Sequence, residues 1–289
     1  MKNFNLLLIA GVLFVFTLNG CSKDDAGDGF LASTAQQNRV ALLEDFTGVR
    51  CQYCPDGHEI AKALLAANPG KFIVIAVHGG DYATPATGWP NFTTMFGGYL
   101  IAQAKVSGYH AGTINREMGL VFGLNPQMPP YGYALNRDQW AAAATFMNAQ
   151  KAPVNIGATA TYNSGTRLLT VKVDLYYTSD QTGSNNINVA LLQDKLYGPQ
   201  SGGKPDPNNY EQNHVLRTFI TGTWGDVISA TGETKGTKIS KTYAYSVPTD
   251  YNGTSADGGG AVVIDNLNVV VFVTAGQTDV LNAKALDVK

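Results

Sequence analysis

The chain of 289 residues carries a formal net charge of −2, with 44% hydrophobic and 15% charged residues. This balance is that of a folded protein with its own hydrophobic cores, and the length is enough for about two domains of ordinary size. A net charge this close to zero provides no excess of basic groups for nucleic acid, so we expect no nucleic-acid partner.

The N-terminus has the features of a secretory signal peptide. Basic Lys2 precedes an apolar run from Leu6 to Leu18, which is too short to span a bilayer comfortably and has the length of a signal-peptide core. The run ends in the letters LNGC, which resemble a bacterial lipobox with Cys21 as its cysteine. This resemblance implies cleavage before Cys21 and a lipid on its sulfur. The alternative is an ordinary cleavable signal with a cysteine at this place by chance.

We therefore expect a signal peptide, residues 1–20, and a flexible tether, residues 21–37, rich in Asp, Gly, Ser and Ala. A diacylglycerol and an acyl chain such as palmitate would anchor the protein permanently, at about 0.8 kcal/mol for each buried CH₂. Ser22 is not the Asp that resembles an inner-membrane retention signal, and residues 23–25 resemble acidic surface-export signals. We expect an anchor in the outer membrane, facing the cell surface or the periplasm.

A strand, a helix and a second strand are expected after the tether. The apolar, β-branched stretch Arg39–Phe46 predicts a buried strand, and Lys71–Val77 reads as a central parallel strand. Between them, Cys54–Asn68 has apolar residues at helical spacing and ends at an Asn-Pro-Gly stop. This order predicts a right-handed βαβ unit. The stretch Gly79–Tyr99, rich in Gly, Pro and aromatic residues, predicts a loop or a small helical insertion.

The α/β part ends with a short strand and a helix. Gly112–Glu117 fits the strand, and Asn136 fits the N-cap of an alanine-rich helix that runs to Gln150. We therefore predict an α/β domain over residues 38–150.

After Lys151-Ala152-Pro153 the apolar pattern changes to a period of two, with turns between the segments. Several short strands without helices predict an all-β sandwich over residues 151–289. The expected strands are 154–162, 168–177, 187–192, 214–221, 238–245 and 267–274.

If Cys21 carries lipid, the remaining cysteines are Cys51 and Cys54, spaced Cys-x-x-Cys. The envelope beyond the inner membrane permits disulfides, and this spacing fits one local redox pair better than a disulfide framework. Cys51 lies near the expected N-terminus of a helix, where free N–H groups and the helix dipole stabilise a thiolate. Such a setting can lower the cysteine pKa from about 8.5 to about 7 or below. Cys54, one turn along, would attack the mixed disulfide.

The letters EDFTGVRCQYC resemble the thioredoxin superfamily in the order of strand, Asp-Phe pair and Cys-x-x-Cys. The resemblance implies a thioredoxin-like domain in which the acid at Asp45 exchanges a proton with Cys54. Thioredoxins also place a cis-proline against the disulfide, and the matching stretch VSGYHAGTINR has His110 there. Because a non-proline cis bond costs about 3 kcal/mol, we expect a trans or strained peptide. His110 is also a candidate to face the sulfurs and lower the thiolate pKa.

A narrower resemblance covers nearly the whole mature chain. The letters ALLEDFTGVRCQYCP, VSGYHAGTINR, NHVLRTFITGTW and VVVFVTAGQTDVLNA look like the 28-kDa outer-membrane-protein family. Its members are envelope lipoproteins of Gram-negative bacteria, so the resemblance implies a thioredoxin-like domain followed by an immunoglobulin-like β domain. It settles architecture better than function.

Three hypotheses for function remain open. Cys51, Cys54, Asp45 and His110 form the catalytic set of a thiol–disulfide oxidoreductase acting on exported proteins. Alternatively, the disulfide only braces a non-catalytic lipoprotein that binds protein or glycan. The third hypothesis is a metal site built from the two cysteines with His110, and with His58 as a weaker ligand. Because that set falls short of a convincing tetrahedral site, we predict no metal and no cofactor.

Overall fold

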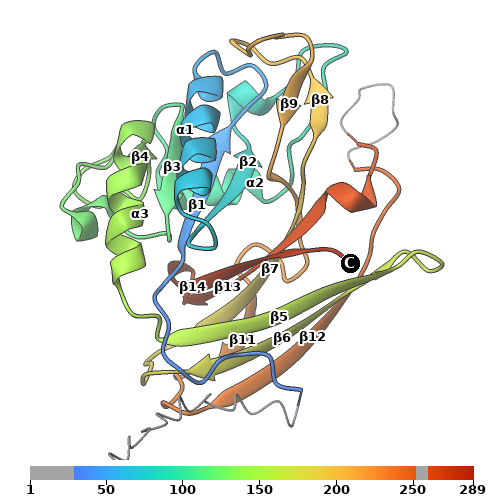
Figure 1. Cartoon of the computed structure of the whole chain (residues 1–289). Helices are drawn as coiled ribbons and strands as arrows, with labels where there is room; N and C mark the ends of the chain where they lie inside the picture. Colours follow the sequence, from blue (N-terminus) through green and yellow to red (C-terminus); the bar gives the residue numbers. More distant parts are fainter. Residues whose placement is uncertain (1–28, 252–259) are drawn as a thin grey trace, which may run out of the picture. The chain divides into compact units, whose positions relative to one another are not determined.

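The computed structural model describes residues 29–251 and 260–289 (Figure 1). In it, β1 (Ala41–Thr47) pairs in parallel with β2 (Phe72–His78), and α1 (Cys54–Ala67) connects them. Every residue of both strands is buried, as in parallel strands covered on both faces. These elements confirm the predicted βαβ unit, with ends shifted by only a residue or two.

A nine-stranded mixed sheet contains this unit and continues into the second half of the chain. Its link is a short parallel pairing of β10 with β2, in which the backbone N–H of Ala76 donates to the carbonyl of His214 at 2.8 Å. The strand order is β14 (Thr278–Asp287), β13 (Leu267–Ala275), β7 (Asn185–Gln193), β10 (Val215–Phe219), β2, β1, β3 (Ala111–Ile114) and β4 (Leu135–Asn136), and β11 (Asp226–Ser229) pairs with β7.

Two smaller antiparallel sheets complete the strands. One has the order β12 (Lys238–Ser246), β6 (Leu168–Tyr177) and β5 (Val154–Asn163), and the other pairs β8 (Leu196–Gly198) with β9 (Tyr210–Gln212). All six strands expected after residue 151 are confirmed, whereas β8, β9, β11 and β14 were not predicted.

Alternating side chains divide the large sheet into two faces with separate cores. On one face, β1 and β2 pack against α1 and α3 (Trp140–Ala149), and on the other they pack against α2 (Gly97–Ala104). Farther along the sheet, β7 and β13 turn their odd-numbered side chains towards β5 and β6. Two sheets with a shared apolar core are thus stacked in this part of the chain.

Short helical turns account for the remaining regular structure. Asn136 and Gln139 form a capping box at the start of the 3-10 helix Arg137–Gln139, which leads into α3. This geometry confirms the predicted N-cap. Other 3-10 helices are Asp81–Ala83, Gly119–Phe122 and Ile264–Asn266.

A buried ion pair connects β3 to its neighbours. The Arg116 guanidinium donates to the Glu44 carboxylate at 2.7–3.1 Å and to the carbonyl of Gln277, in the turn between β13 and β14, at 3.2 Å. Thr113 also donates to Glu44, at 3.1 Å. Both charged residues are only 2% exposed, so the charge of each offsets the cost of burying the other away from water.

The chain is therefore a mixed α/β protein with one large mixed sheet and smaller antiparallel sheets. Residues Leu31–Lys289 form one unit, and the large sheet runs through both predicted domains. The division into domains 38–150 and 151–289 stays a prediction. The predicted signal peptide and the first part of the tether, residues 21–28 with Cys21, lie outside the described residues.

Candidate functional site

Cys51 and Cys54 form a disulfide at the start of α1, with Cys54 as the first residue of the helix. Pro55 follows in the first helical turn, where its missing N–H has no partner to lose. The predicted placement of the pair is confirmed. Cys51 is 2% exposed and Cys54 is fully buried, so the folded chain covers both cysteines.

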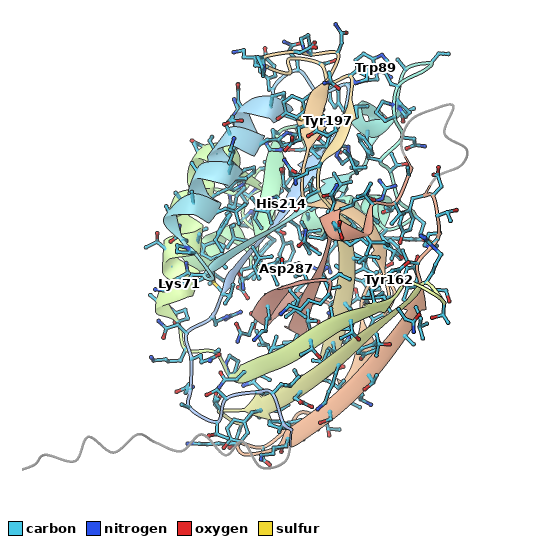
Figure 2. The ribbon with its side chains drawn as sticks, turned by 45° about the vertical axis from the view of Figure 1, so that its right-hand side comes forward. Lys71, Trp89, Tyr162, Tyr197, His214 and Asp287 are labelled. Carbon is cyan, nitrogen blue, oxygen red and sulfur yellow. A yellow bond between two sulfur atoms is a disulfide. The ribbon has the colours of Figure 1, made fainter. Side chains whose placement is uncertain are left out.

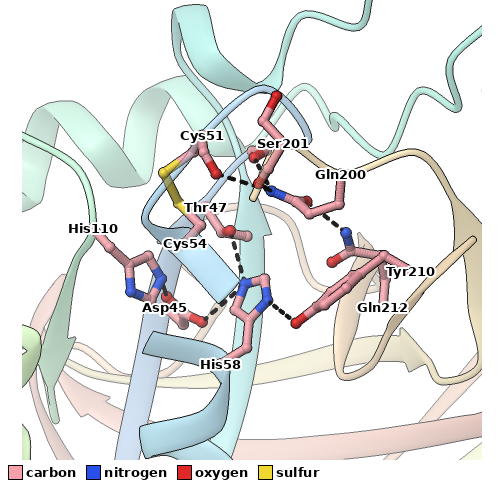
Figure 3. A network of polar contacts seen from close by, with 11 residues as sticks. Asp45, Thr47, Cys51, Cys54, His58, His110, Gln200, Ser201, Tyr210 and Gln212 are labelled. Atoms are coloured by element: carbon pink, nitrogen blue, oxygen red, sulfur yellow. Dashed lines mark hydrogen bonds and ion pairs between the residues drawn. A yellow bond between two sulfur atoms is a disulfide. The ribbon is translucent and has the colours of Figure 1, made fainter. Parts of the chain in front are cut away.

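The loop between β8 and β9, residues 199–209, which we call the cover loop, binds the backbone of the Cys-x-x-Cys turn (Figure 3). The amide of Gln200 donates to the carbonyl of Cys51 at 3.0 Å and to that of Gly48 at 3.2 Å. The backbone N–H of Ser201 donates to the carbonyl of Val49 at 2.8 Å. Gly202 lies so close that a Cβ would stand 2.1 Å from the carbonyl oxygen of Gln52. A segment far along the chain thus closes over the Cys-x-x-Cys turn.

Three polar side chains converge beneath the same helix. Asp45 on β1 is 1% exposed, and its carboxylate contacts the imidazole of His110, which immediately precedes β3. The Nε2 atom of His58 on α1 lies 3.8 Å from the Asp45 carboxylate. Because His58 follows Cys54 by four residues, both side chains lie on one face of the helix. The structure therefore brings Asp45 and His110 to the face of α1 that carries Cys54, as Figure 3 shows.

Gly57 makes room for His110 against the helix. A Cβ on Gly57 would stand 1.7 Å from His110 Nδ1, so the imidazole ring packs where another residue would place its side chain. The ring also meets Trp140 edge to face, with ring centroids 5.1 Å apart. The Tyr109–His110 peptide is cis, so the expectation of a trans peptide is wrong. The side chain of His110 reaches Asp45.

His58 is held at both ring nitrogens. Its Nε2 lies 2.9 Å from the Thr47 hydroxyl, and its Nδ1 lies 3.0 Å from the hydroxyl of Tyr210 on β9. Tyr210 thus connects the hairpin of the cover loop to the cluster beneath the disulfide. Nothing in the sequence pattern pointed to Tyr210 or Gln200, because both lie in a segment without periodicity.

Burial decides the charges in the cluster. Burial lowers the pKa of His58 to about 4 and that of His78, on the neighbouring strand, to about 3. Burial acts to raise the pKa of Asp45, but attraction to His110 and a hydrogen bond from it lower that pKa overall. At neutral pH the site therefore contains an ionised carboxylate beside the neutral imidazole of His58.

A pocket of about 510 Å³ opens between α1 and the β8–β9 hairpin and reaches Asp45 and His58. Tyr197 and His214, both labelled in Figure 2, lie on its wall. A smaller pocket of about 280 Å³ lies on another side of the site and is lined by Tyr109, His110, Asn136, Arg137 and Asp138. The cluster therefore meets a cavity on each of two sides.

The fold and the site define a mixed α/β protein with a covered Cys-x-x-Cys disulfide at a helix N-terminus. In the described ranges, no helix has both the length and the apolar character needed to cross a membrane. Residues 99–289 match the family described as Outer membrane protein Omp28, and the chain belongs to that family. The matched residues include His110 but begin after Cys51 and Cys54.

Solved structures resemble this chain at low sequence identity. HBP35 of Porphyromonas gingivalis is 16% identical over 87% of this chain and 76% of its own, with a TM-score of 0.63. Protein AGR_C_4864 from Agrobacterium tumefaciens is 11% identical over 87% of this chain and 96% of its own, with a TM-score of 0.53. A domain of the outer membrane lipoprotein Omp28 from Porphyromonas gingivalis is 22% identical over 48% of this chain and 89% of its own, with a TM-score of 0.32. The comparison with curated proteins finds no match. The first two likenesses show the fold alone.

Proposed function

We propose that this protein is an outer-membrane lipoprotein, anchored through Cys21, that exchanges disulfides with exported proteins through Cys51 and Cys54. The observation that carries the proposal is the position of the disulfide at the N-terminus of α1, above the buried Asp45 and His110. The proposal includes a thioredoxin-like domain over residues 38–150 and an immunoglobulin-like sandwich over residues 151–289.

The exchange proceeds in two steps. The Cys51 thiolate attacks a disulfide of the substrate, forms a mixed disulfide and releases one substrate thiolate, which takes up a proton. Cys54 then loses its proton to Asp45, attacks the Cys51 sulfur and releases the second substrate thiolate. The chain is oxidised to its disulfide while the substrate is reduced to two thiols. The reverse reaction oxidises two substrate thiols.

The second candidate is a binding lipoprotein in which the disulfide only braces the fold. The 2% exposure of Cys51 and its contacts with the cover loop favour this function. With Cys51 only 2% exposed, an incoming thiolate reaches its sulfur only after the covering residues move.

Redox equilibration with glutathione separates the two candidates. For exchange we expect a reduction potential within the range of known exchange proteins, about −270 to −120 mV. We also expect that Cys54→Ser traps a mixed disulfide on Cys51 and that Cys51→Ser does not. A potential below about −300 mV without exchange would refute the exchange function. Unchanged partner capture by a Cys51→Ser, Cys54→Ser double variant would then support the binding function.

The anchor has its own test. Mass spectrometry of the protein from membranes should find diacylglycerol and acyl chains on Cys21, and Cys21→Ser should release the protein from the outer-membrane fraction. Retention of Cys21→Ser in that fraction would count against anchoring through this residue.

A further inference from the structure

Asp45, His58 and His110 form a compact set of metal-ligand atoms. They come from β1, α1 and the residue before β3, and one ligand atom from each lies within 4.8 Å of the others. Two imidazoles and a carboxylate are a donor set that binds zinc in proteins. The metal site considered from the sequence used the two cysteines as ligands. In the structure the cysteines are joined in a disulfide, and the Asp45 carboxylate is the third ligand instead.

The distances are close to those that zinc requires. Bonds of about 2.0–2.1 Å place two ligand atoms of a tetrahedral ion about 3.4 Å apart. The Asp45 carboxylate and His58 Nε2 are 3.8 Å apart. The Asp45–His110 contact is shorter than the zinc geometry, so a turn of the Asp45 carboxylate away from the ring would open the space for an ion.

The surroundings orient the ligands. Tyr210 holds His58 at Nδ1, and Nε2 lies on the side of Asp45, where it would exchange its contact with the Thr47 hydroxyl for the ion. A partner at the second ring nitrogen fixes the tautomer and orientation of a metal-binding histidine. Gly57 and Trp140 both pack against the His110 ring. The ligands are thus positioned by packing and hydrogen bonds before any ion arrives.

The pocket between α1 and the β8–β9 hairpin provides an access route, because it reaches both Asp45 and His58. Glu59 and Glu211 line it with carboxylates, and Lys62 and Lys204 line it with ammonium groups. An ion at the cluster would keep a coordination position directed to this pocket, as in zinc sites with three protein ligands.

We propose that Asp45, His58 and His110 bind one Zn²⁺ ion, with a fourth position open to the pocket. The site uses no cysteine and is therefore present in the oxidised protein. It shares Asp45 with the proposed exchange, so a bound ion would prevent Asp45 from accepting the Cys54 proton.

Calorimetry on the oxidised, EDTA-treated full chain tests the site with Zn²⁺ alone. We expect one ion per chain, and we expect His58→Gln to weaken binding at least tenfold. Tyr210→Phe, which removes only the hydrogen bond to His58, should weaken binding about tenfold. His214→Gln is the matched control, because His214 lines the same pocket outside the cluster. Co²⁺ should show the strong visible bands of a tetrahedral ion in the wild type and lose them in His58→Gln.

Several results would overturn the proposal. The first is that the oxidised wild type takes up no stoichiometric Zn²⁺. The second is that His58→Gln binds Zn²⁺ as tightly as the wild type, and the third is that uptake appears only after the disulfide is reduced. Equal losses in His214→Gln and His58→Gln would indicate a surface site in the pocket. Circular dichroism and the urea midpoint of each variant establish that it is folded, so that a lost site is not a lost fold.

Discussion

Gly57→Ala is the sharpest test of the packing beneath the disulfide. In a helix this change ordinarily stabilises a protein by about 0.5–1 kcal/mol, because alanine loses less backbone entropy. At Gly57 the new methyl group would stand 1.7 Å from His110 Nδ1 and 2.1 Å from its Cε1. The ring has to move by more than an ångström, and overpacking of this kind costs typically about 1–3 kcal/mol. After subtraction of the helix gain, we expect a net loss of about 1–2 kcal/mol.

A double-mutant cycle with His110→Ala isolates this contact. Without the imidazole ring, Gly57→Ala should become neutral or stabilising by up to about 1 kcal/mol. The coupling between the two sites is then about 1–3 kcal/mol, within the range for residues in contact. Urea unfolding of the oxidised protein measures all four free energies. Gly98→Ala on α2 is the control, because a Cβ there meets no atom within 4 Å. Equal effects of Gly57→Ala in both backgrounds, to within about 0.5 kcal/mol, would refute the reasoning.

Three further changes probe the cover loop, the buried ion pair and a buried carboxyl group. Gln200→Ala removes the donor to two backbone carbonyls, those of Gly48 and Cys51. At about 1 kcal/mol for each hydrogen bond, reduction of the disulfide by dithiothreitol should become about ten- to thirtyfold faster. An unchanged rate would mean that the cover loop does not limit access to the disulfide. Arg116→Met leaves the Glu44 carboxylate buried without its charged partner. The free energy of unfolding in urea should fall by about 3–5 kcal/mol. The Glu44→Met, Arg116→Met double variant should recover a large part of this loss. Burial and the neighbouring Asp279 raise the pKa of Glu117 to about 8, so the folded state keeps this proton to a higher pH than the unfolded state does. The free energy of unfolding should therefore fall as the pH rises from about 4.5 to about 8, and Glu117→Gln should make it fall less; parallel wild-type and variant curves would contradict this assignment.

Local patterns were enough to predict the elements that carry the disulfide. The apolar runs of β1 and β2 and the helical spacing of α1 are short-range signals, and the capping box at Asn136 is another. The cysteine pair follows from spacing and position alone. The strand β14 was missed because Val280 to Ala283 are buried on both faces, so the expected alternation is absent.

Contacts between distant segments could not be predicted in the same way. The pairing of β10 with β2 rests on a short contact between strands far apart in the chain, for which the two sequences carry no mutual signal. Gln200 is a buried amide in a loop, a residue type and setting that usually indicate a solvated turn. The fit of His110 into the gap at Gly57 depends on two residues in separate motifs, and neither motif specifies the distance between them.

If the protein exchanges disulfides as proposed, the burial of the disulfide would slow the exchange without abolishing it. The cover loop is held over the Cys-x-x-Cys turn by two side-chain hydrogen bonds from Gln200 and one backbone bond from Ser201. At a net value of about 1 kcal/mol for each bond, opening this segment costs about 3 kcal/mol. Such a local opening leaves on the order of one molecule in a hundred open at equilibrium. If the loop recloses faster than a thiol attacks, the rate of the reaction with that thiol falls by the same factor. A substrate that binds the open loop more tightly than the closed one recovers part of that loss through its own binding energy. The cover loop would then act as a filter that spares the disulfide from small thiols and admits a protein substrate.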